Sequence, residues 1–309
     1  MPGFNYLAHM ATYNRQITDV AEFMTRLENF TFVHNWIEEH NNSNAGWTAG
    51  HNQFSDWSHA EYKQMLGYAG RMEGAERRAP TVFPETNASS VNWVDAGAVT
   101  PVKDQGQCGS CWAFSTTGSL EGAHFVATGK LESFSEQQLV DCAFVSYGNY
   151  ACNGGLQENA YNYYEDGFKA ELESVYPYTS GSTMKRSTCA YKASSATAVT
   201  VSDYLAVTPD NVSQMKAALD KQPLAVSIEA DKMVFQTYSS GVMSSTKCGT
   251  SLDHAVLAVG YGTENGEDYW LVKNSWNTTW GDQGYIKLAI VDGEGICGVQ
   301  MEPLAPASN

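Results

Sequence analysis

The sequence predicts an α+β fold with two lobes and a cleft between them, preceded by a helical N-terminal segment. Apolar residues recur at helical spacing over residues 18–41, whereas runs typical of β-strands dominate after about residue 196. Apolar residues form 43% of the 309-residue chain, which includes 8 Trp and 17 Tyr, a composition typical of a globular protein. Because helical and β patterns occupy different parts of the chain, we expect separate lobes with a cleft between them.

A long helix is expected near the N-terminus, over residues 18–41. Thr18 or Asp19 can cap its first turn. Its apolar positions recur at steps of three and four, which keeps them on one face of the helix. These positions are Phe23, Leu27, Phe30, Val33 and Ile37.

A second, shorter helix is expected at residues 58–66, because Ser58 is followed three residues later by Glu61, as in a capping box. The composition then changes. Residues 70–86 contain Gly, Pro and the Arg77-Arg78 pair with little periodicity. That composition predicts an exposed linker and a target for proteases.

The remaining elements follow in the order of the chain. A helix is expected from Cys111 toward Thr128, where Gly129 is a suitable C-terminal stop. Another short helix is expected at residues 135–140. Strands, separated by glycine-containing turns, are expected at residues 224–228, 254–261, 269–274 and 284–288.

Charge and hydropathy exclude two classes of partner. The formal net charge is −16, whereas nucleic acids and anionic membranes require a basic surface. No run of about 18 apolar residues is present, so no segment is expected to span a membrane. The first ten residues lack a basic region followed by an apolar one, so the chain itself shows no signal peptide.

The cysteine count is odd, which favours three disulfides and one free thiol in an oxidising compartment. The cysteines are Cys108, Cys111, Cys142, Cys152, Cys189, Cys248 and Cys297. Six cysteines allow fifteen pairings, among which the sequence alone does not choose. A zinc site is the alternative for Cys108-x-x-Cys111, although no second close Cys or His pair accompanies it.

One of these cysteines has the surroundings of a nucleophile. Residues 105–114 are QGQCGSCWAF, which places Cys111 after a glycine turn and at the start of the expected helix. The N-terminal end of a helix lowers the pKa of a thiol and favours the reactive thiolate. A buried structural cysteine is the alternative interpretation of Cys111 taken alone.

A nucleophilic thiol needs a base, and the base needs a group that orients it. His254 enters an apolar strand in Leu252-Asp253-His254-Ala255-Val256, and Asn274 ends another apolar strand in WLVKNSW. Each residue alone is more often an ordinary hydrogen-bonded core residue. Along the chain, Cys111 is followed roughly 150 residues later by His254 and then Asn274. This order and spacing fit a cysteine nucleophile with its His and Asn partners.

Together these motifs resemble those of the papain-like cysteine proteases, closest to the cathepsin L type, over nearly the whole chain. The matching stretches are residues 105–114, Asn153-Gly154-Gly155, Asp253-His254-Ala255, Asn274-Ser275-Trp276 and Trp280-Gly281. The resemblance implies a papain-like fold with one mainly helical lobe, one β-barrel lobe and the active site between them. It implies a monomer that acts on protein or peptide substrates with no metal and no cofactor.

The resemblance also implies roles for five residues. Cys111 is expected to be the nucleophile and His254 its proton partner, resting as a thiolate–imidazolium pair. Asn274 is expected to orient the His254 ring, and Trp276 to shield their hydrogen bond from water. The Gln105 side chain and the Cys111 backbone N–H are expected to form the oxyanion hole.

The same resemblance also implies which cysteines pair as disulfides and which residues bind the substrate. It implies the disulfides Cys108–Cys152, Cys142–Cys189 and Cys248–Cys297. It implies a substrate cleft formed by Gly154, Gly155, Leu156, Gln157, Ser227, Leu252, Asp253, Ala255 and Glu302. Glu302 lies at the expected floor of the pocket for the second residue before the cleaved bond, where cathepsin B has Glu and accepts Arg; a solvent-facing Glu302 is the alternative. Residues 142–152 are too few to hold the occluding loop of cathepsin B, so we expect an endopeptidase.

The N-terminal part resembles an inhibitory propeptide, so we expect a propeptide at residues 1–86 and a peptidase domain at 87–309. Glu22, Arg26, Phe30, Ile37 and Asn41 match the ERFNIN pattern, with Val33 in place of its first Asn, and Gly50, Asn52, Phe54 and Asp56 complete the second motif. Residues 65–68 are expected to cross the active site in the direction opposite to substrate, with Gly67 near the thiol. Family proenzymes activate at acid pH, and protonation of Asp56 is a candidate trigger.

Two further functional interpretations stay open at this stage. A papain-fold protein without activity would serve as a binding or storage module, although such proteins usually lack the nucleophile or the His. The released residues 1–86 could inhibit other proteases. A lysosomal, acidic-vesicle or secreted location is expected, and the triplets at Asn29, Asn41, Asn87, Asn211 and Asn277 would then be glycosylation sequons.

Overall fold

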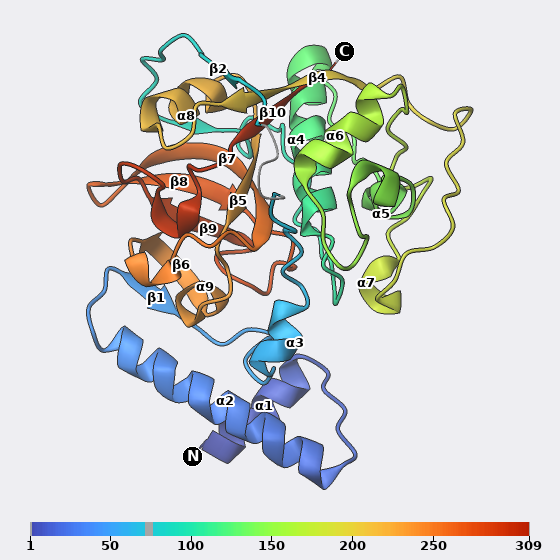
Figure 1. The fold of residues 1–309 in the computed structure, drawn as a ribbon. Helices are drawn as coiled ribbons and strands as arrows, with labels where there is room; N and C mark the ends of the chain where they lie inside the picture. Colours follow the sequence, from blue (N-terminus) through green and yellow to red (C-terminus); the bar gives the residue numbers. More distant parts are fainter. Residues whose placement is uncertain (1, 72–76, 309) are drawn as a thin grey trace.

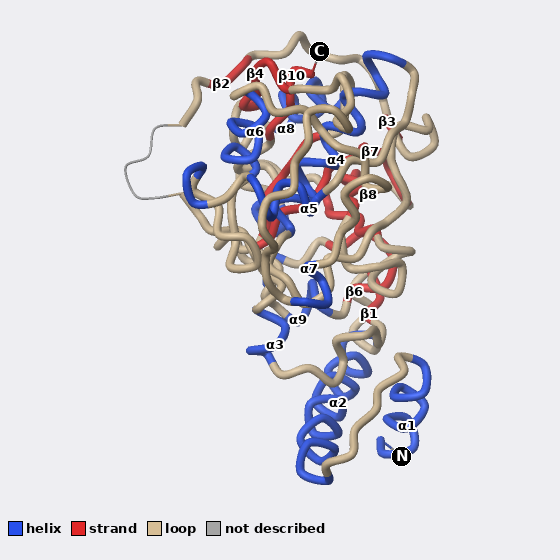
Figure 2. The backbone as a smooth tube through the Cα atoms, turned by 90° about the vertical axis from the view of Figure 1, so that its right-hand side faces the viewer, coloured by secondary structure: helices blue, strands red, loops and turns tan. Residues whose placement is uncertain are grey.

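The computed structural model describes residues 2–71 and 77–308. Two lobes, each with its own apolar core, stand side by side, and a separate pair of helices lies below them (Figure 1). The turned view shows the same pair of helices extending away from the rest of the molecule (Figure 2). The expected α+β fold with two lobes and an N-terminal helical segment is confirmed.

The helical lobe is built around α4 (Cys111–Thr128), whose first fourteen residues are buried. Gly129 ends α4 in the left-handed conformation, with φ of 72°, as the sequence predicts. The lobe also contains α5 (Glu136–Cys142), α6 (Gln157–Glu165), α7 (Ser180–Thr183) and the 3₁₀ turn Val145–Tyr147. The sequence did not predict α6, because its buried face is made of tyrosines in an otherwise polar stretch.

The second lobe contains most of a ten-stranded sheet with the order β1-β6-β9-β8-β7-β5-β10-β4-β2, in which β3 also pairs with β7. Its strands are β3 (Val91–Asn92), β4 (Val201–Val207), β5 (Leu224–Ile228), β6 (Tyr238–Met243), β7 (His254–Glu264), β8 (Glu267–Lys273), β9 (Tyr285–Ala289) and β10 (Leu304–Ser308). The predicted β5, β7, β8 and β9 are confirmed. Short helices join them: α8 (Val212–Leu219), α9 (Met233–Gln236), and the 3₁₀ turns Thr246–Cys248 and Ile296–Gly298.

The N-terminal segment contains α1 (Pro2–Thr12), α2 (Val20–Asn41), β1 (Trp47–Ala49), α3 (His59–Lys63) and β2 (Pro80–Thr81). Asp19 caps α2, and Ser58 and Glu61 form the predicted capping box of α3. The sequence did not predict α1, which depends on tertiary packing. Tyr6 of α1 is fully buried, and its ring lies 5.3 Å from that of Phe30 in α2.

The N-terminal segment supplies a strand at each end of the sheet. At one end β1 pairs antiparallel with β6, and at the other β2 pairs parallel with β4. Between these two strands the chain passes α3 and runs through the space between the lobes (Figure 1). Backbone pairing therefore holds the segment to the β lobe on both sides of its passage.

Residues 72–76 of the expected exposed linker at residues 70–86 lie outside the described residues. About half of the described linker residues are exposed, and the others are half-buried. Arg78 donates to the Tyr204 carbonyl oxygen at 3.0 Å and stacks 3.7 Å from the Tyr204 ring centroid. Arg77 pairs with Glu302 at 2.7 Å. The two arginines bind carboxylates and an aromatic ring of the main body, an interaction that sequence composition does not reveal.

Six of the seven cysteines form three disulfides, and Cys111 is a buried free thiol. The pairs are Cys108–Cys152, Cys142–Cys189 and Cys248–Cys297. Because Cys108 is bonded to Cys152, the zinc alternative for Cys108 and Cys111 loses one of its two thiolates. No described helix is long and apolar enough to cross a membrane.

Candidate active site

The free thiol lies at the first residue of α4, at the boundary between the lobes. Cys111 follows Ser110, the N-cap residue, so its thiol lies where the helix presents unpaired backbone N–H groups. The Ala255 backbone N–H donates to Cys111 Sγ at 3.4 Å, which places the thiol beside the start of β7. Helix α4 from one lobe and β7 from the other therefore bring Cys111 next to His254.

His254 is held in place by two residues that follow strand β8, Asn274 and Trp276. Its Nε2 lies 2.8 Å from Asn274 Oδ1, just beyond the end of β8. The Trp276 ring stacks on the His254 ring with centroids 4.6 Å apart. His254 is fully buried, and Asn274 and Trp276 are nearly so. The structure thus brings together Cys111, His254, Asn274 and Trp276, the four residues expected from the sequence to act as nucleophile, base, orienting group and shield.

Burial determines the protonation of the two groups in this state. It raises the pKa of the Cys111 thiol to about 12, outweighing the backbone N–H groups that favour the thiolate. Burial likewise lowers the pKa of His254 to about 4. Both directions favour a neutral thiol and a neutral imidazole. The thiolate–imidazolium pair that the resemblance implies is therefore disfavoured while the N-terminal segment covers the site.

The Gln105 side chain is fixed with its amide nitrogen toward the cleft. Its Oε1 accepts from the Ser275 hydroxyl at 2.7 Å and from the Trp276 indole N–H at 3.1 Å. Its Nε2 donates at 2.8 Å to the carbonyl oxygen of Met65. The Met65 carbonyl of the N-terminal segment thus accepts a hydrogen bond from the Gln105 amide. The same amide is expected to donate to the oxyanion of a substrate.

Residues 67–69 of the N-terminal segment run along the cleft beside Gly155. The Gly155 N–H donates to the Gly67 carbonyl at 2.9 Å, and the Ala69 N–H donates to the Gly155 carbonyl at 3.1 Å. The Tyr68 N–H donates to the Asp253 carbonyl at 3.0 Å on the opposite side. Tyr68 and Gly155 form a parallel bridge. The segment is therefore held on both sides as it passes the thiol.

Gly67 is placed where no side chain fits. A Cβ atom added to it would lie 1.9 Å from the carbonyl oxygen of Gly109, two residues before Cys111. We expect Gly67→Ala to weaken the docking of the N-terminal segment by about 1–3 kcal/mol, because the backbone must move. Processing of this variant at a fixed acid pH is expected to be faster than that of the wild type, followed by gel or mass.

The product of this variant supplies its own control. Once the N-terminal segment is removed, both chains leave the same main body, so any kcat/KM values measured for the two products must agree. An unchanged processing rate would show that Gly67 does not need close contact with Gly109.

The second sequence motif of the N-terminal segment contacts the β lobe. Asn52 donates to the Gln236 carbonyl at 2.7 Å, and the Gly50 N–H donates to the Thr237 carbonyl at 2.8 Å. Phe54 is buried, with its ring 5.3 Å from that of Trp276. Asp56 is fully buried in the segment itself, where Arg15 pairs with it at 3.2 Å. Through Phe54, the motif thus connects the N-terminal segment to Trp276, the residue that stacks on His254.

The predicted face of α2 packs as a unit. Arg26 pairs with Glu22 at 2.9 Å and also with Glu61 of α3 at 2.9 Å, so it joins two helices rather than forming a solvated pair alone. Asn41 exchanges two 2.9 Å hydrogen bonds with the Ala49 backbone. Phe30, Val33 and Ile37 are buried, so the Val33 that replaces the family's Asn packs in the interior. The other two predicted apolar positions, Phe23 and Leu27, are half-buried.

The expected substrate cleft is brought together only in part. Gly154, Gly155, Asp253 and Ala255 line the path of residues 67–69 or the thiol. Leu156 and Leu252 are half-buried beside them. Gln157 donates to Ser227 at 3.2 Å, and both residues are buried.

Glu302 does not face solvent. Its side chain is 6% exposed, because Tyr68 donates its hydroxyl to it and Arg71 pairs with it at 3.2 Å. Three side chains of the N-terminal segment, those of Tyr68, Arg71 and Arg77, therefore cover this carboxylate.

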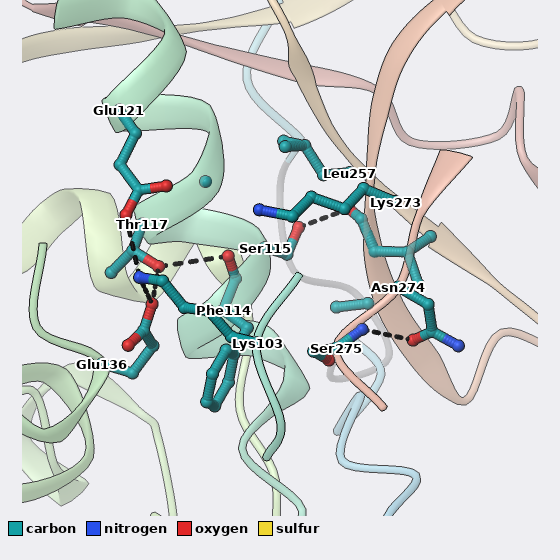
Figure 3. Close-up of a pocket in the computed structure, with 13 residues that line it drawn as sticks. Lys103, Phe114, Ser115, Thr117, Glu121, Glu136, Leu257, Lys273, Asn274 and Ser275 are labelled. Carbon is teal, nitrogen blue, oxygen red and sulfur yellow. Dashed lines mark hydrogen bonds and ion pairs between the residues drawn. The ribbon is translucent and has the colours of Figure 1, made fainter. Parts of the chain in front are cut away.

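A buried ionic cluster behind the thiol was not foreseen. Lys103 lies between Glu121 and Glu136, at 2.9 and 2.6 Å (Figure 3). Lys273, the residue before Asn274, donates to Thr100 at 3.1 Å, and burial lowers its pKa to about 8. The cluster joins α4, α5 and β8, the elements that position Cys111 and Asn274. No sequence signal marked it, because its members are far apart along the chain.

Comparisons with known proteins agree with this geometry. The profile of the papain family of cysteine proteases matches residues 87–307. The profile of the cathepsin propeptide inhibitor domain (I29) matches residues 6–62. These two matches cover the main body and most of the N-terminal segment.

Similar proteins cover nearly the whole chain. Digestive cysteine proteinase 1 of Homarus americanus is 43% identical over 287 residues, 90% of this chain and 86% of its own. A cathepsin L-like peptidase of Aedes aegypti is 45% identical over 77% of this chain and 72% of its own. The solved structure of digestive procathepsin L 3 of the Tenebrio molitor larval midgut superimposes with a TM-score of 0.87 at 33% identity, covering 99% of both chains. The chain belongs to the papain family of cysteine proteases and is a cathepsin L-like proenzyme that carries its own inhibitory propeptide.

Proposed function

We propose that this proenzyme yields an endopeptidase with Cys111 as nucleophile and His254 as its proton partner. The observation that carries the proposal is the 2.8 Å hydrogen bond between His254 Nε2 and Asn274 Oδ1. An amide oxygen only accepts, so it favours the proton on Nε2 and leaves Nδ1 free to take the thiol proton. Nδ1 has no hydrogen-bond partner among the described residues.

The steps follow from these positions. When the propeptide leaves, water reaches both groups and relieves the burial that keeps them neutral. The proton passes from Cys111 Sγ to His254 Nδ1, and the thiolate attacks the peptide carbonyl. The oxyanion accepts N–H bonds from the Gln105 side chain and the Cys111 backbone. His254 then protonates the leaving amine, and water hydrolyses the thioester.

The direct test is acid incubation with two readouts. The purified protein is held at about pH 4–5 with a reductant, a pH range in which histidines are protonated, while its mass and its hydrolysis of a Phe-Arg amide are followed. An epoxide that alkylates thiols is expected to block hydrolysis and to label Cys111. A chain that stays intact and silent in acid, and that gains no activity when an added protease cuts it, would favour the binding-module alternative.

We place the start of the mature enzyme within residues 86–90, so that residues 87–309 form the peptidase domain. Val91 already pairs with Tyr261 of β7, which supports assigning the chain from there on to the mature fold. Because Arg77 and Arg78 are bound to the main body, a cut near them has to follow their release.

We infer that the mature cleft accepts both apolar residues and arginine at the second position before the cleaved bond. Tyr68 follows Gly67 and reaches Glu302, which supports a carboxylate in that pocket. We expect hydrolysis of both Phe-Arg and Arg-Arg amides, and loss of Arg-Arg hydrolysis by roughly tenfold or more in Glu302→Ala. Phe-Arg hydrolysis by the same variant is the control, and unaltered Arg-Arg hydrolysis would contradict the assignment.

We further infer that acid pH releases the propeptide, and that a histidine cluster responds before Asp56. His34 Nδ1 lies 3.0 Å from His51 Nε2, and the His51 ring stacks on Phe30 at 4.4 Å. The His9 ring also packs against Phe30, with centroids 5.0 Å apart, and His9 lies 3.8 Å from Asp56. A hydrogen bond between two imidazoles needs one bare nitrogen, so it is lost when both rings are protonated.

The two kinds of group act in different pH windows. Burial and the neighbouring histidines lower the pKa of His51 to about 4, below its ordinary 6.5. Its contribution to propeptide docking is therefore lost as pH falls from about 6.5 to about 4. Burial raises the pKa of Asp56, but His9 and Arg15 outweigh it and lower that pKa below 3.8. Asp56 thus loses its contribution only below pH 3.8.

We expect His51→Gln to move the midpoint pH of self-processing downward by roughly half a unit or more, because a neutral side chain replaces the titrating ring. Processing is measured across pH 3.5–7, a range that spans the titration of His. His59→Gln is the matched control, since His59 is exposed in α3. Asp56→Asn is expected to weaken docking at every pH in this range. A midpoint that moves in Asp56→Asn but not in His51→Gln would identify Asp56 as the trigger.

We infer an oxidising, acidic compartment, lysosomal, vesicular or extracellular. Three disulfides support the first property, and the net charge of −16 is compatible with the second. The substrates are proteins or peptides, the enzyme is expected to act as a monomer, and nucleic acid is not expected as a partner.

A further inference from the structure

Two carboxylates from different elements meet beneath the propeptide in one cavity. Glu158 lies in the first turn of α6, and Glu302 lies two residues before β10. Each residue is 8% exposed. The main body supplies otherwise apolar residues to the cavity wall, and the N-terminal segment supplies the rest. The apolar residues of the main body are Ala206, Val207, Pro209, Met301, Pro303 and Leu304.

The propeptide already places a guanidinium between these carboxylates. Arg71 Nη2 lies 2.5 Å from Glu158, and its Nε lies 3.2 Å from Glu302. Two different nitrogens of one planar group therefore bind two different carboxylates. Arg71 follows Tyr68 by three residues, and both side chains bind Glu302.

Every cation paired with the two carboxylates belongs to the propeptide. Among the described residues, the cationic partners of Glu158 and Glu302 are Arg71 and Arg77 alone. When the propeptide leaves, two adjacent carboxylates remain in an apolar cavity with no cation between them. Adjacent like charges in such surroundings strongly favour a bound cation.

We propose that Glu158 is a second specificity-determining residue, which with Glu302 forms a two-carboxylate site for the guanidinium of a substrate arginine. The inference rests on the proposed peptidase function and deepens it. Glu302 alone would accept arginine and lysine alike, as a single anion. A site with two carboxylates favours arginine over lysine. The planar guanidinium of arginine can donate from one nitrogen to each carboxylate, whereas the lysine ammonium is one compact point charge.

A simpler role exists for Glu158. An acidic residue in the first turn of a helix stabilises the positive end of the helix dipole. That role would affect the fold or all substrates equally, and it would not distinguish arginine from lysine.

The test compares activated enzymes on three peptide amides with Arg, Lys or Phe at the second position before the cleaved bond. The variants are Glu158→Gln, Glu302→Gln, the double variant and Glu165→Gln. Glu165 is the matched control, because it lies at the other end of α6 and its substitution removes the same charge. Glutamine keeps the volume of glutamate, and Glu158→Asp keeps the charge if the glutamine variant does not fold.

We expect Glu158→Gln to lower kcat/KM for the Arg peptide by about tenfold or more, with less than a twofold change for the Phe peptide. The Arg-to-Lys preference of the wild type is expected to fall toward one, and Glu165→Gln is expected to leave it unchanged. Equal losses on the Arg and Phe peptides would assign Glu158 to structure. An unaltered Arg-to-Lys ratio would leave Glu302 as the sole determinant. A wild-type enzyme that does not cleave the Phe peptide would instead overturn the proposed peptidase function.

Discussion

Replacement of Cys111 by alanine is expected to abolish self-processing and to lower amide hydrolysis by roughly 10⁵-fold or more. The reason is chemical: the thiol forms the covalent bond to the acyl group, and no other described cysteine is free. The variant is expected to remain a full-length chain after incubation at about pH 4–5, where histidines carry a proton. Intact mass and Phe-Arg amide hydrolysis measure the two effects.

Two controls separate lost chemistry from lost folding. The alanine variant is expected to unfold at a temperature close to that of the wild type, because alanine is a small buried substitute that adds no polar group. After its propeptide is cut by an added protease, it is expected to bind the same peptides without cleaving them. Self-processing that persists in Cys111→Ala would rule out this residue as nucleophile.

Gln105→Ala is expected to slow turnover of the mature enzyme by roughly a hundredfold, about 3 kcal/mol of transition-state stabilisation. The same side chain donates to Met65 of the propeptide, so the variant is also expected to hold its propeptide less tightly. The prediction is therefore two changes of opposite sign: easier removal of the propeptide, and a less active product. Measuring propeptide removal by an added protease and kcat of the isolated product separates them.

Ser275→Ala provides a graded comparison. Ser275 touches the Gln105 Oε1 atom and not the position of the substrate oxyanion. Its loss is expected to reduce kcat by less than Gln105→Ala, because the Trp276 indole still orients the amide. A change under about threefold in Gln105→Ala would reject an oxyanion role, since removal of a donor of this kind typically costs far more.

The sequence predicted the residues whose chemistry is tied to a local motif. Cys111, Gln105 and the end of α4 at Gly129 lie in short stretches with recognisable turns and caps. His254 and Asn274 each begin or follow an apolar strand, so their strands were predictable, although only the structure gives the 2.8 Å contact between them. The capping box at Ser58 was predictable for the same local reason.

Features that depend on long-range packing were not predictable. Helix α1 has one fully buried tyrosine that packs on α2, and isolated propensity does not reveal that contact. The Arg77-Arg78 pair has the composition of a free linker, yet it binds the main body. Lys103 and Lys273 join elements across the lobes, and no spacing rule connects them.

The strands that the propeptide adds at the two ends of the sheet have a consequence for how activity appears over time. A single cut within residues 70–79 separates β1 and α3 from β2 covalently, but the contacts of Asn52, Phe54 and Gly67 remain. Before the cut, the inhibitor has an effective concentration in the millimolar range, as for other tethered ligands. After the cut, occupancy of the cleft follows mass action. A freshly cut sample is therefore still largely inhibited when concentrated, and dilution releases the enzyme.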